Sequence, residues 1–164
     1  MSPSLYYAFD PLHRLNPREV HQLYKLRVDV FVHEQQCPYA EIDDTDALDS
    51  TMHVQTYTIA DKELIACARI YPENGRYHLG RVVVHKDHRG QGLGKELMYQ
   101  TLRYAFEQHP DWDVYLEAQV AQEKFYGDFG FVRCGHNFDW DGVEHIPMLL
   151  KSADLVKLFR NTVE

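Results

Sequence analysis

The stretch Arg89-Gly90-Gln91-Gly92-Leu93-Gly94 carries the clearest chemical signal in the sequence. A β-branched run precedes it at residues 81–84, and apolar residues at helical spacing follow it, which predicts a strand, a glycine-rich turn and a helix. Glycines at three alternate positions leave the turn almost bare of side chains, so a large anion can approach the backbone. The first N–H groups of the helix, its macrodipole and the charge of Arg89 all attract an anion. The pattern therefore predicts a binding site for a phosphate or pyrophosphate.

The spacing of the glycines excludes two common phosphate-binding loops. A dinucleotide-binding loop needs two residues between its second and third glycines, and here only Leu93 separates Gly92 from Gly94. A Walker loop needs Ser or Thr after Gly-Lys, and here Glu96 follows. For these residues taken alone, a glycine-rich connection without a ligand stays as the alternative.

The loop resembles the acetyl-CoA loop of the GNAT N-acetyltransferases, Gln/Arg-x-x-Gly-x-Gly/Ala, through Arg89, Gly92 and Gly94. The resemblance implies that the loop amides hold the pyrophosphate of acetyl-CoA, and that the preceding strand end holds its pantetheine arm. No metal is predicted, because the His and Cys residues lack the spacing of a metal site. The coenzyme-binding residues expected from the resemblance are Val82, Val83, Val84, Arg89, Gly90, Gln91, Gly92, Leu93, Gly94 and Tyr126.

Further segments resemble the same family. Residues 121–131 resemble its Ala-x-x-x-Tyr-x-x-x-Gly-Phe element, which places Tyr126 at the position of the general acid. Residues 31–46, which include Pro38 and Tyr39, resemble the signature of the ElaA-like branch, as do His53 and residues 141–148. The resemblance covers nearly the whole chain, and implies direct transfer of an acetyl group from acetyl-CoA to an amine.

The reaction needs an acid for the leaving thiolate and a route for the proton of the acceptor ammonium. A phenol with a pKa of about 10 suits the first task, which supports Tyr126, although a core aromatic is the alternative for this residue. For the second task the candidate bases are Glu117, Glu34 and His53, with His145 as a fourth. Ordered water could also carry the proton away without any single base.

The chain is acidic, with 17 Lys and Arg against 25 Asp and Glu and a net charge of −8. This balance disfavours nucleic acid and anionic membranes as partners and suits a cationic amine acceptor. The acidic run at residues 41–46 predicts either a negative mouth for such an amine or a solvated loop. The pairs His85/His88 and His33/Cys37 lack the further ligands of a closed zinc site.

The location that the sequence predicts is the cytoplasm. No apolar run reaches the ~20 residues of a membrane span, and the first nine residues lack the pattern of a signal peptide. The three cysteines, Cys37, Cys67 and Cys134, are too scattered for a disulfide framework and favour a reducing compartment.

Hydrophobic periodicity predicts strands and helices throughout the chain. Strands are expected at residues 5–9, 51–60, 63–71, 77–84 and 112–119, with a closing hairpin at 131–138 and 144–150. A first helix is expected from the cap Asn16 to about residue 34, with no continuation past Pro38, and others at 92–108, 121–128 and 153–163. The resemblance implies an α+β (three-layer α/β) fold, with a central mixed, mostly antiparallel sheet flanked by helices, as a single domain over residues 1–164.

The function predicted from these observations is an N-acetyltransferase for a primary amine of a small molecule or peptide. The alternative is a non-catalytic acyl-CoA-binding module that senses the coenzyme or holds a partner. A different acyl chain, such as succinyl or propionyl, would use the same loop. Because GNAT proteins often form dimers, the resemblance also raises a homodimer as one assembly.

Overall fold

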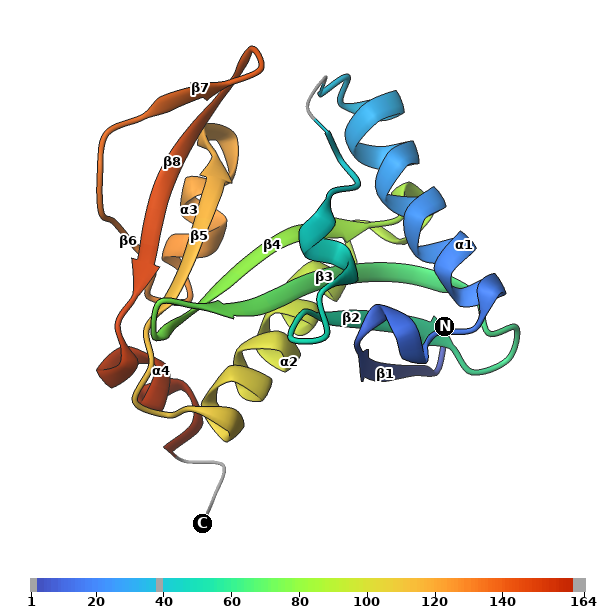
Figure 1. Ribbon diagram of the computed structural model, residues 1–164, viewed down its shortest axis with the longest axis horizontal. Coiled ribbons are helices and arrows are strands. Elements are labelled where there is room, and N and C mark those ends of the chain that lie inside the picture. The colour runs from blue at the N-terminus through green and yellow to red at the C-terminus, as the bar shows by residue number, and fades with distance from the viewer. Residues whose placement is uncertain (1–2, 38–39, 161–164) are drawn as a thin grey trace. The chain divides into compact units, whose positions relative to one another are not determined.

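The computed structural model describes residues 3–37 and 40–160 (Figure 1). Pro38 and Tyr39, which belong to the segment that resembles the ElaA-like branch, lie outside the described residues, and so does the end of the predicted last helix. Within the described ranges the helices are α1 (Pro17–Arg27), α2 (Leu93–Gln108), α3 (Glu123–Gly127) and α4 (Ser152–Phe159). The strands are β1 (Leu5–Asp10), β2 (Met52–Thr58), β3 (Leu64–Glu73), β4 (Arg76–Val84), β5 (Val114–Gln119), β6 (Val132–Arg133), β7 (Phe138–Trp140) and β8 (Val143–Leu150).

The strands join in the order β1-β2-β3-β4-β5-β8-β6, and β7 also pairs with β8. Strands β4 and β5 run parallel, whereas β1 with β2, β2 with β3, and β8 with β5, β6 and β7 pair antiparallel. This arrangement confirms the predicted α+β class with a mixed, mostly antiparallel sheet flanked by helices.

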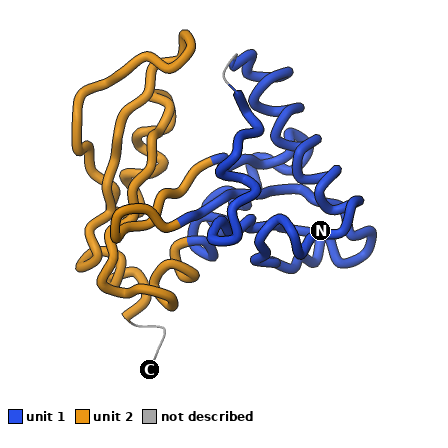
Figure 2. The backbone as a smooth tube through the Cα atoms, viewed as in Figure 1, with its two compact units in different colours: residues 1–71, 81–101 blue, residues 72–80, 102–164 orange. Residues whose placement is uncertain are grey.

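The backbone divides into two compact units (Figure 2). Unit 1 comprises residues 1–71 and 81–101, and unit 2 comprises residues 72–80 and 102–164. Strands β3 and β4 and helix α2 contribute residues to both units. The single domain over residues 1–164 stays a prediction.

Helix α1 of unit 1 begins as its sequence predicts. The side chain of Asn16 accepts a hydrogen bond from the amide of Glu19 at 2.8 Å, and the Glu19 carboxylate accepts one from the Asn16 amide at 2.9 Å. This reciprocal capping box satisfies two amides that the first helical turn leaves without partners. The helix and the segment after it then form an apolar cluster with β2, β3 and β4, made of Leu23, Leu26, Val30, Phe31, Tyr57, Leu64, Cys67 and Val83.

The first helix does not remain α-helical to residue 34. After Arg27 the chain winds as a π-helix over Val28–Glu34, in which the Gln35 amide donates to the Val30 carbonyl at 2.8 Å. This wider winding is rare, and hydrophobic periodicity read at 3.6 residues per turn does not distinguish it from an α-helix. Val30 and Phe31 both remain buried, while Glu34 lies exposed at the end of the π-helical segment.

Unit 2 contains β5 and β8 paired along six residues, from Val114 opposite Leu150 to Gln119 opposite His145. The first arm of the predicted closing hairpin is interrupted, since it forms the two-residue β6 and the separate β7. The reason lies in Pro147 of β8, which has no N–H to donate to the neighbouring strand. The ladder of β6 therefore ends after Arg133, and Gly135 passes so close that a Cβ there would lie 2.9 Å from the Pro147 ring.

Candidate functional site

The glycine-rich loop of unit 1 connects the end of β4 to the start of α2, as predicted. Gly90 and Gly92 have φ angles of +78° and +77°, in the left-handed region that glycine adopts without strain. A Cβ at either position would meet no protein atom within 4 Å. The packing of unit 1 therefore does not require these glycines; the backbone conformation does, and it leaves open space in front of the loop.

Helix α2 presents unbonded amides to this open space. The amide of Glu96 donates to the Gly92 carbonyl at 3.1 Å, which is the first hydrogen bond of the helix. The amides of the residues between them have no acceptor within the helix, and the helix dipole adds partial positive charge there. Bare amides beside left-handed glycines are the donor set that a pyrophosphate needs, so the loop fits the phosphates of a coenzyme A molecule.

The guanidinium of Arg89 in the loop forms hydrogen bonds and an ion pair with other residues of unit 1. Its Nε donates to the Val84 carbonyl at 3.0 Å, and its two Nη atoms form a bidentate ion pair with the Glu34 carboxylate at 2.5 and 3.0 Å. The hydrogen bonds from Arg89 lower the pKa of Glu34, so this carboxylate holds a proton less readily than an ordinary glutamate. The predicted phosphate ligand and one predicted base are thus partners in this structure.

A cavity of about 180 Å³ adjoins the loop within unit 1. The hydroxyl of Tyr7, a residue of the cavity lining, is buried and lies near the side chain of Thr56. Because the cavity borders Gly92 and the first turn of α2, it adds space beside the open amides. Its lining residues are Pro3, Leu5, Tyr7, Ile65, His88, Gln91, Gly92, Leu93 and Glu96.

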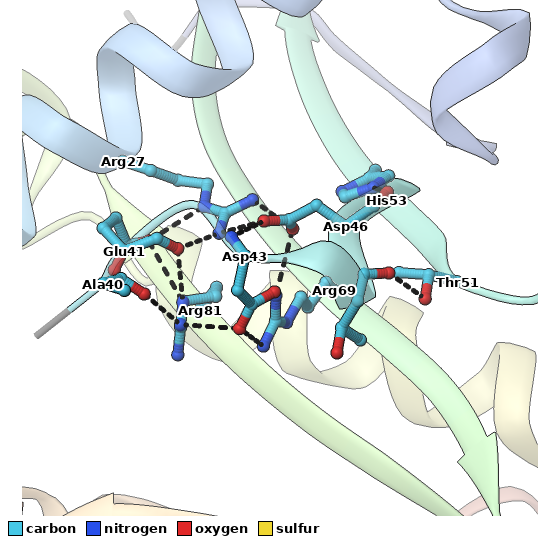
Figure 3. A network of polar contacts seen from close by, with 10 residues as sticks. Arg27, Ala40, Glu41, Asp43, Asp46, Thr51, His53, Arg69 and Arg81 are labelled. Carbon is cyan, nitrogen blue, oxygen red and sulfur yellow. Dashed lines mark hydrogen bonds and ion pairs between the residues drawn. The ribbon is translucent and has the colours of Figure 1, made fainter. Parts of the chain in front are cut away.

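The acidic run at residues 41–46 is neither a negative mouth nor a solvated loop. Three of its carboxyl groups face arginines inside unit 1 (Figure 3). Arg27 from α1 is 1% exposed and bonds Glu41 at 2.9 Å and Asp46 at 2.6 Å. The prediction failed because the partners of these carboxyl groups lie far away in the sequence, on other elements.

Two further arginines complete this charge network, which consists of Arg27, Glu41, Asp43, Asp46, Arg69 and Arg81. Arg69 of β3 bonds Asp43 at 2.7 Å and Asp46 at 3.1 Å. Arg81 of β4 lies 3.2 Å from a Glu41 carboxylate oxygen and 3.4 Å from one of Asp43. Three guanidinium groups thus balance three carboxyl groups, and the loop is tied to three elements of unit 1.

Arg81 also has an unusual backbone conformation, with φ at +53° inside a strand. A non-glycine residue in this region costs about 1–3 kcal/mol and persists only where the surroundings enforce it. Here the side chain donates to the Ala40 and Glu41 carbonyls at 3.3 and 3.2 Å, in addition to its ion pairs. The charge network therefore holds the backbone of β4 at a positive φ immediately before Val82, Val83 and Val84.

His53 lies against the charge network and is fully buried. Its Nε2 lies 2.9 Å from the Asp46 carbonyl, so Nε2 carries the proton and donates, and the buried Nδ1 has no partner among the described residues. Burial lowers the pKa of His53, since a second proton would place an unpaired charge in the interior beside two arginines. A side chain without exposed surface is not positioned to accept a proton from a bound amine, which argues against His53 as the base.

The remaining predicted catalytic residues belong to unit 2. Tyr126 of α3 is partly buried, with its ring edge-on to Phe125 and Phe131. Burial raises the pKa of Tyr126 to about 12, so the phenol is protonated at neutral pH. Glu117 of β5 is exposed and lies opposite Pro147. His145 is 3% exposed, and its Nδ1 lies 2.8 Å from the Val143 carbonyl.

The arginines of the charge network were missed in the sequence, although a signal for one of them was present. Arg27 lies four residues after Leu23 and four before Phe31, on the apolar face of the helical segment. A charged residue on such a face indicates a buried partner. Arg69 and Arg81 stand within strands and carried no comparable signal.

The structure shows neither a metal cluster nor a membrane span in the part of the chain that it describes. Among residues 3–37 and 40–160 no group of three or more His, Cys, Asp or Glu side chains could hold a metal ion. No helix in these ranges has the length and apolar character needed to cross a bilayer. Cys37 and Cys67 are buried free thiols, and Cys134 is an exposed one.

Known proteins resemble the chain over most of its length. The model of the acetyltransferase (GNAT) domain matches residues 19–152. Protein ElaA of Escherichia coli K12 is 36% identical over 137 residues, which are 82% of this chain and 88% of that protein. An acyl-CoA N-acyltransferase from Pseudomonas aeruginosa has a TM-score of 0.83 at 36% identity, covering 90% of this chain and 99% of the other. The crystal structure of Escherichia coli ElaA has a TM-score of 0.83 at 33% identity, covering 90% and 100%.

Removal of one network carboxylate should destabilise the protein strongly. We expect Asp46→Asn to lower the free energy of unfolding by about 3–5 kcal/mol, because it leaves Arg27 and Arg69 buried without full compensation. The control is Asp44→Asn, which changes an exposed carboxylate of the same loop and should alter stability by less than about 0.5 kcal/mol. Urea unfolding followed by circular dichroism measures both, and equal midpoints would contradict a stabilising network.

Stability should also fall in mildly acidic solution because of His53. An unfolded imidazole binds a proton below a pH of about 6.5, whereas the buried ring stays neutral to lower pH. Below that pH the unfolded state binds more protons than the folded state. The stability that the neutral His53 ring contributes is therefore fully present above pH ~6.5, and it is lost as the pH falls below this value. Urea midpoints between pH 7.5 and 5 should fall less steeply for His53→Gln than for the parent. If the midpoints of both proteins fall in parallel with pH, His53 is not the cause of the loss of stability.

Proposed function

Since the chain belongs to the GNAT acetyltransferase family, we propose that it transfers the acetyl group of acetyl-CoA directly to a primary amine of a small molecule or peptide. The relatives confirm the predicted family and its ElaA-like branch. The fold is accordingly the GNAT acyl-CoA N-acyltransferase fold. The observation that carries the proposal is the glycine-rich loop of unit 1, where left-handed Gly90 and Gly92 leave the first amides of α2 open to a ligand.

The first task of the site is to anchor the coenzyme. In our proposal the amides at the start of α2 bind the pyrophosphate, and the end of β4, at Val82, Val83 and Val84, lies along the pantetheine arm. The exposed Lys86 and Lys95 add positive charge at the two ends of the loop. Acetyl-CoA supplies the activated thioester, so no metal is needed for the chemistry.

The second task is to release the coenzyme as a thiol. Tyr126 is proposed to donate a hydrogen bond to the sulfur on which negative charge develops. Because burial raises the pKa of its phenol to about 12, donation of a hydrogen bond is favoured over complete loss of the proton. The proton that finally completes the thiol then comes from the acceptor ammonium, or from solvent in exchange with it.

The third task is to remove a proton from the acceptor ammonium, so that its nitrogen gains a lone pair. Among the predicted bases, Glu117 is favoured because its side chain is exposed on β5. Glu34 is held by Arg89 with a lowered pKa, and His53 is buried. Ordered water remains the alternative carrier. The three free thiols support a reducing location such as the cytoplasm.

A larger side chain at Gly92 should remove coenzyme binding. We expect Gly92→Asn to weaken acetyl-CoA by at least tenfold, because the new side chain fills the space in front of the amides while Asn tolerates a left-handed φ. The matched control is Gly75→Asn, since Gly75 has a φ of +73° and equally open surroundings but lies in the β3–β4 turn. Calorimetric titration of both variants provides the measurement, and unchanged affinity of the Gly92 variant would remove the phosphate site from this loop.

Loss of the Tyr126 hydroxyl should slow the reaction more than it weakens binding. We expect Tyr126→Phe to reduce turnover by about 10²-fold while the Kd for acetyl-CoA stays within about twofold. Tyr104→Phe, another partly buried tyrosine of unit 2 with a raised pKa, is the control. Release of free thiol is measured with a panel of amines. Equal turnover of the two variants would exclude Tyr126, and coenzyme binding by the parent without thiol release would favour the non-catalytic module.

A further inference from the structure

We propose that Glu34 holds Arg89 as an internal substitute for a coenzyme phosphate, and that coenzyme binding exchanges the carboxylate for the phosphate. The inference rests on the proposed function, because it concerns the same loop. It assigns Glu34 a positioning role that sets coenzyme affinity, in place of the role of base.

The contacts of Arg89 divide into a fixed edge and an exchangeable one. Its Nε donates to the Val84 carbonyl at 3.0 Å, which anchors the guanidinium to the end of β4. The two Nη atoms face the two oxygens of Glu34 in a fork. Carboxylate and phosphate both match this planar fork, so a phosphate can replace Glu34 without moving the guanidinium from Val84.

Because the ion pair of Arg89 with Glu34 is exposed, its separation costs little free energy. The side chains of Arg89 and Glu34 are 42% and 37% exposed, so water already solvates both ions. Exposed ion pairs contribute little to stability, whereas a phosphate bound on the loop can also accept hydrogen bonds from the open amides at the start of α2. A phosphate thus gains more partners than the carboxylate that it displaces.

Glu34 also weakens the positive potential of the loop. Arg89 and Lys86, beside the loop, act electrostatically on the Glu34 carboxylate. The negative charge of Glu34 therefore opposes the approach of an anionic coenzyme to Arg89 and Lys86. Neutralising Glu34 while keeping its shape should strengthen the binding of phosphate-bearing ligands and of no others.

The exchange also connects the loop with the π-helical segment. Glu34 is the last residue of Val28–Glu34, and its ion pair reaches a residue 55 positions further along the chain. Once a phosphate takes Arg89, the end of this segment loses that anchor. Binding of the coenzyme should therefore increase amide hydrogen exchange in residues 30–37.

The test compares the parent protein with Glu34→Gln, and with Glu34→Ala as a second variant. Each is titrated calorimetrically with coenzyme A, 3′-dephospho-coenzyme A and pantetheine. We expect Glu34→Gln to bind both phosphate-bearing ligands about two- to fivefold more tightly, and pantetheine unchanged. Its exchange in residues 30–37 should be high without ligand and should not rise further with it.

The matched control is Glu123→Gln, which removes the carboxylate from a similarly exposed bidentate pair with Arg133 in unit 2. This variant loses the same charge, so an equal gain in its coenzyme affinity would overturn the exchange. Unchanged or weaker affinity in both Glu34 variants would also overturn it, and would assign Glu34 to orienting Arg89 or to no part in binding. Failure of the parent itself to bind coenzyme A would instead refute the proposed function.

Discussion

Burial of Arg27 is the constraint on which the organisation of unit 1 depends. Removing a guanidinium from water costs several kcal/mol, and the cost is met only by well-placed carboxylates and carbonyls. Glu41 and Asp46 provide these groups, so the acidic segment that contains them must lie against Arg27 of α1. The same carboxyl groups then face Arg69 of β3 and Arg81 of β4, which fixes the loop against the sheet.

The coenzyme loop is connected to this buried charge network through the backbone. Arg81 is held at a positive φ by the network, and the three valines that end β4 follow it directly. The carbonyl of the last valine, Val84, binds Arg89, and Arg89 binds Glu34 at the end of the segment that starts after Arg27. Covalent and polar links thus connect the loop with the charge network by two routes, and the ion pair of Arg89 with Glu34 is a solvent-exposed link among them.

Sequence reasoning predicted the structure correctly where residues close together in the sequence determine the local conformation. The capping box of α1 and the glycine-rich turn before α2 depend on neighbouring residues, and both were predicted. It failed where a distant partner decides the outcome. Pro147 interrupts the strand beside it, and the acidic run is paired with arginines from three other elements.

The roles of the candidate site residues are harder to obtain from sequence for the same reason. Residue type alone made Glu34, Glu117 and His53 equivalent as bases, since each can accept a proton near neutral pH once its environment allows. Their surroundings separate them, because Arg89 stabilises the charge of Glu34 and burial keeps His53 neutral. Environment, and not residue type, thus distinguishes the candidate bases.

The net charge of −8 sets a further requirement for the loop. The charge network contributes nothing to this excess, because three arginines face three carboxyl groups, so the negative charge resides on other side chains. An anionic coenzyme must therefore bind against the overall field of the protein. At physiological ionic strength that field is screened within about 8 Å, whereas amides in direct contact are not screened. Local donors at the start of α2 are thus the type of interaction that lets an acidic protein hold a pyrophosphate, and an exchangeable carboxylate balances the charge of Arg89 until that ligand arrives.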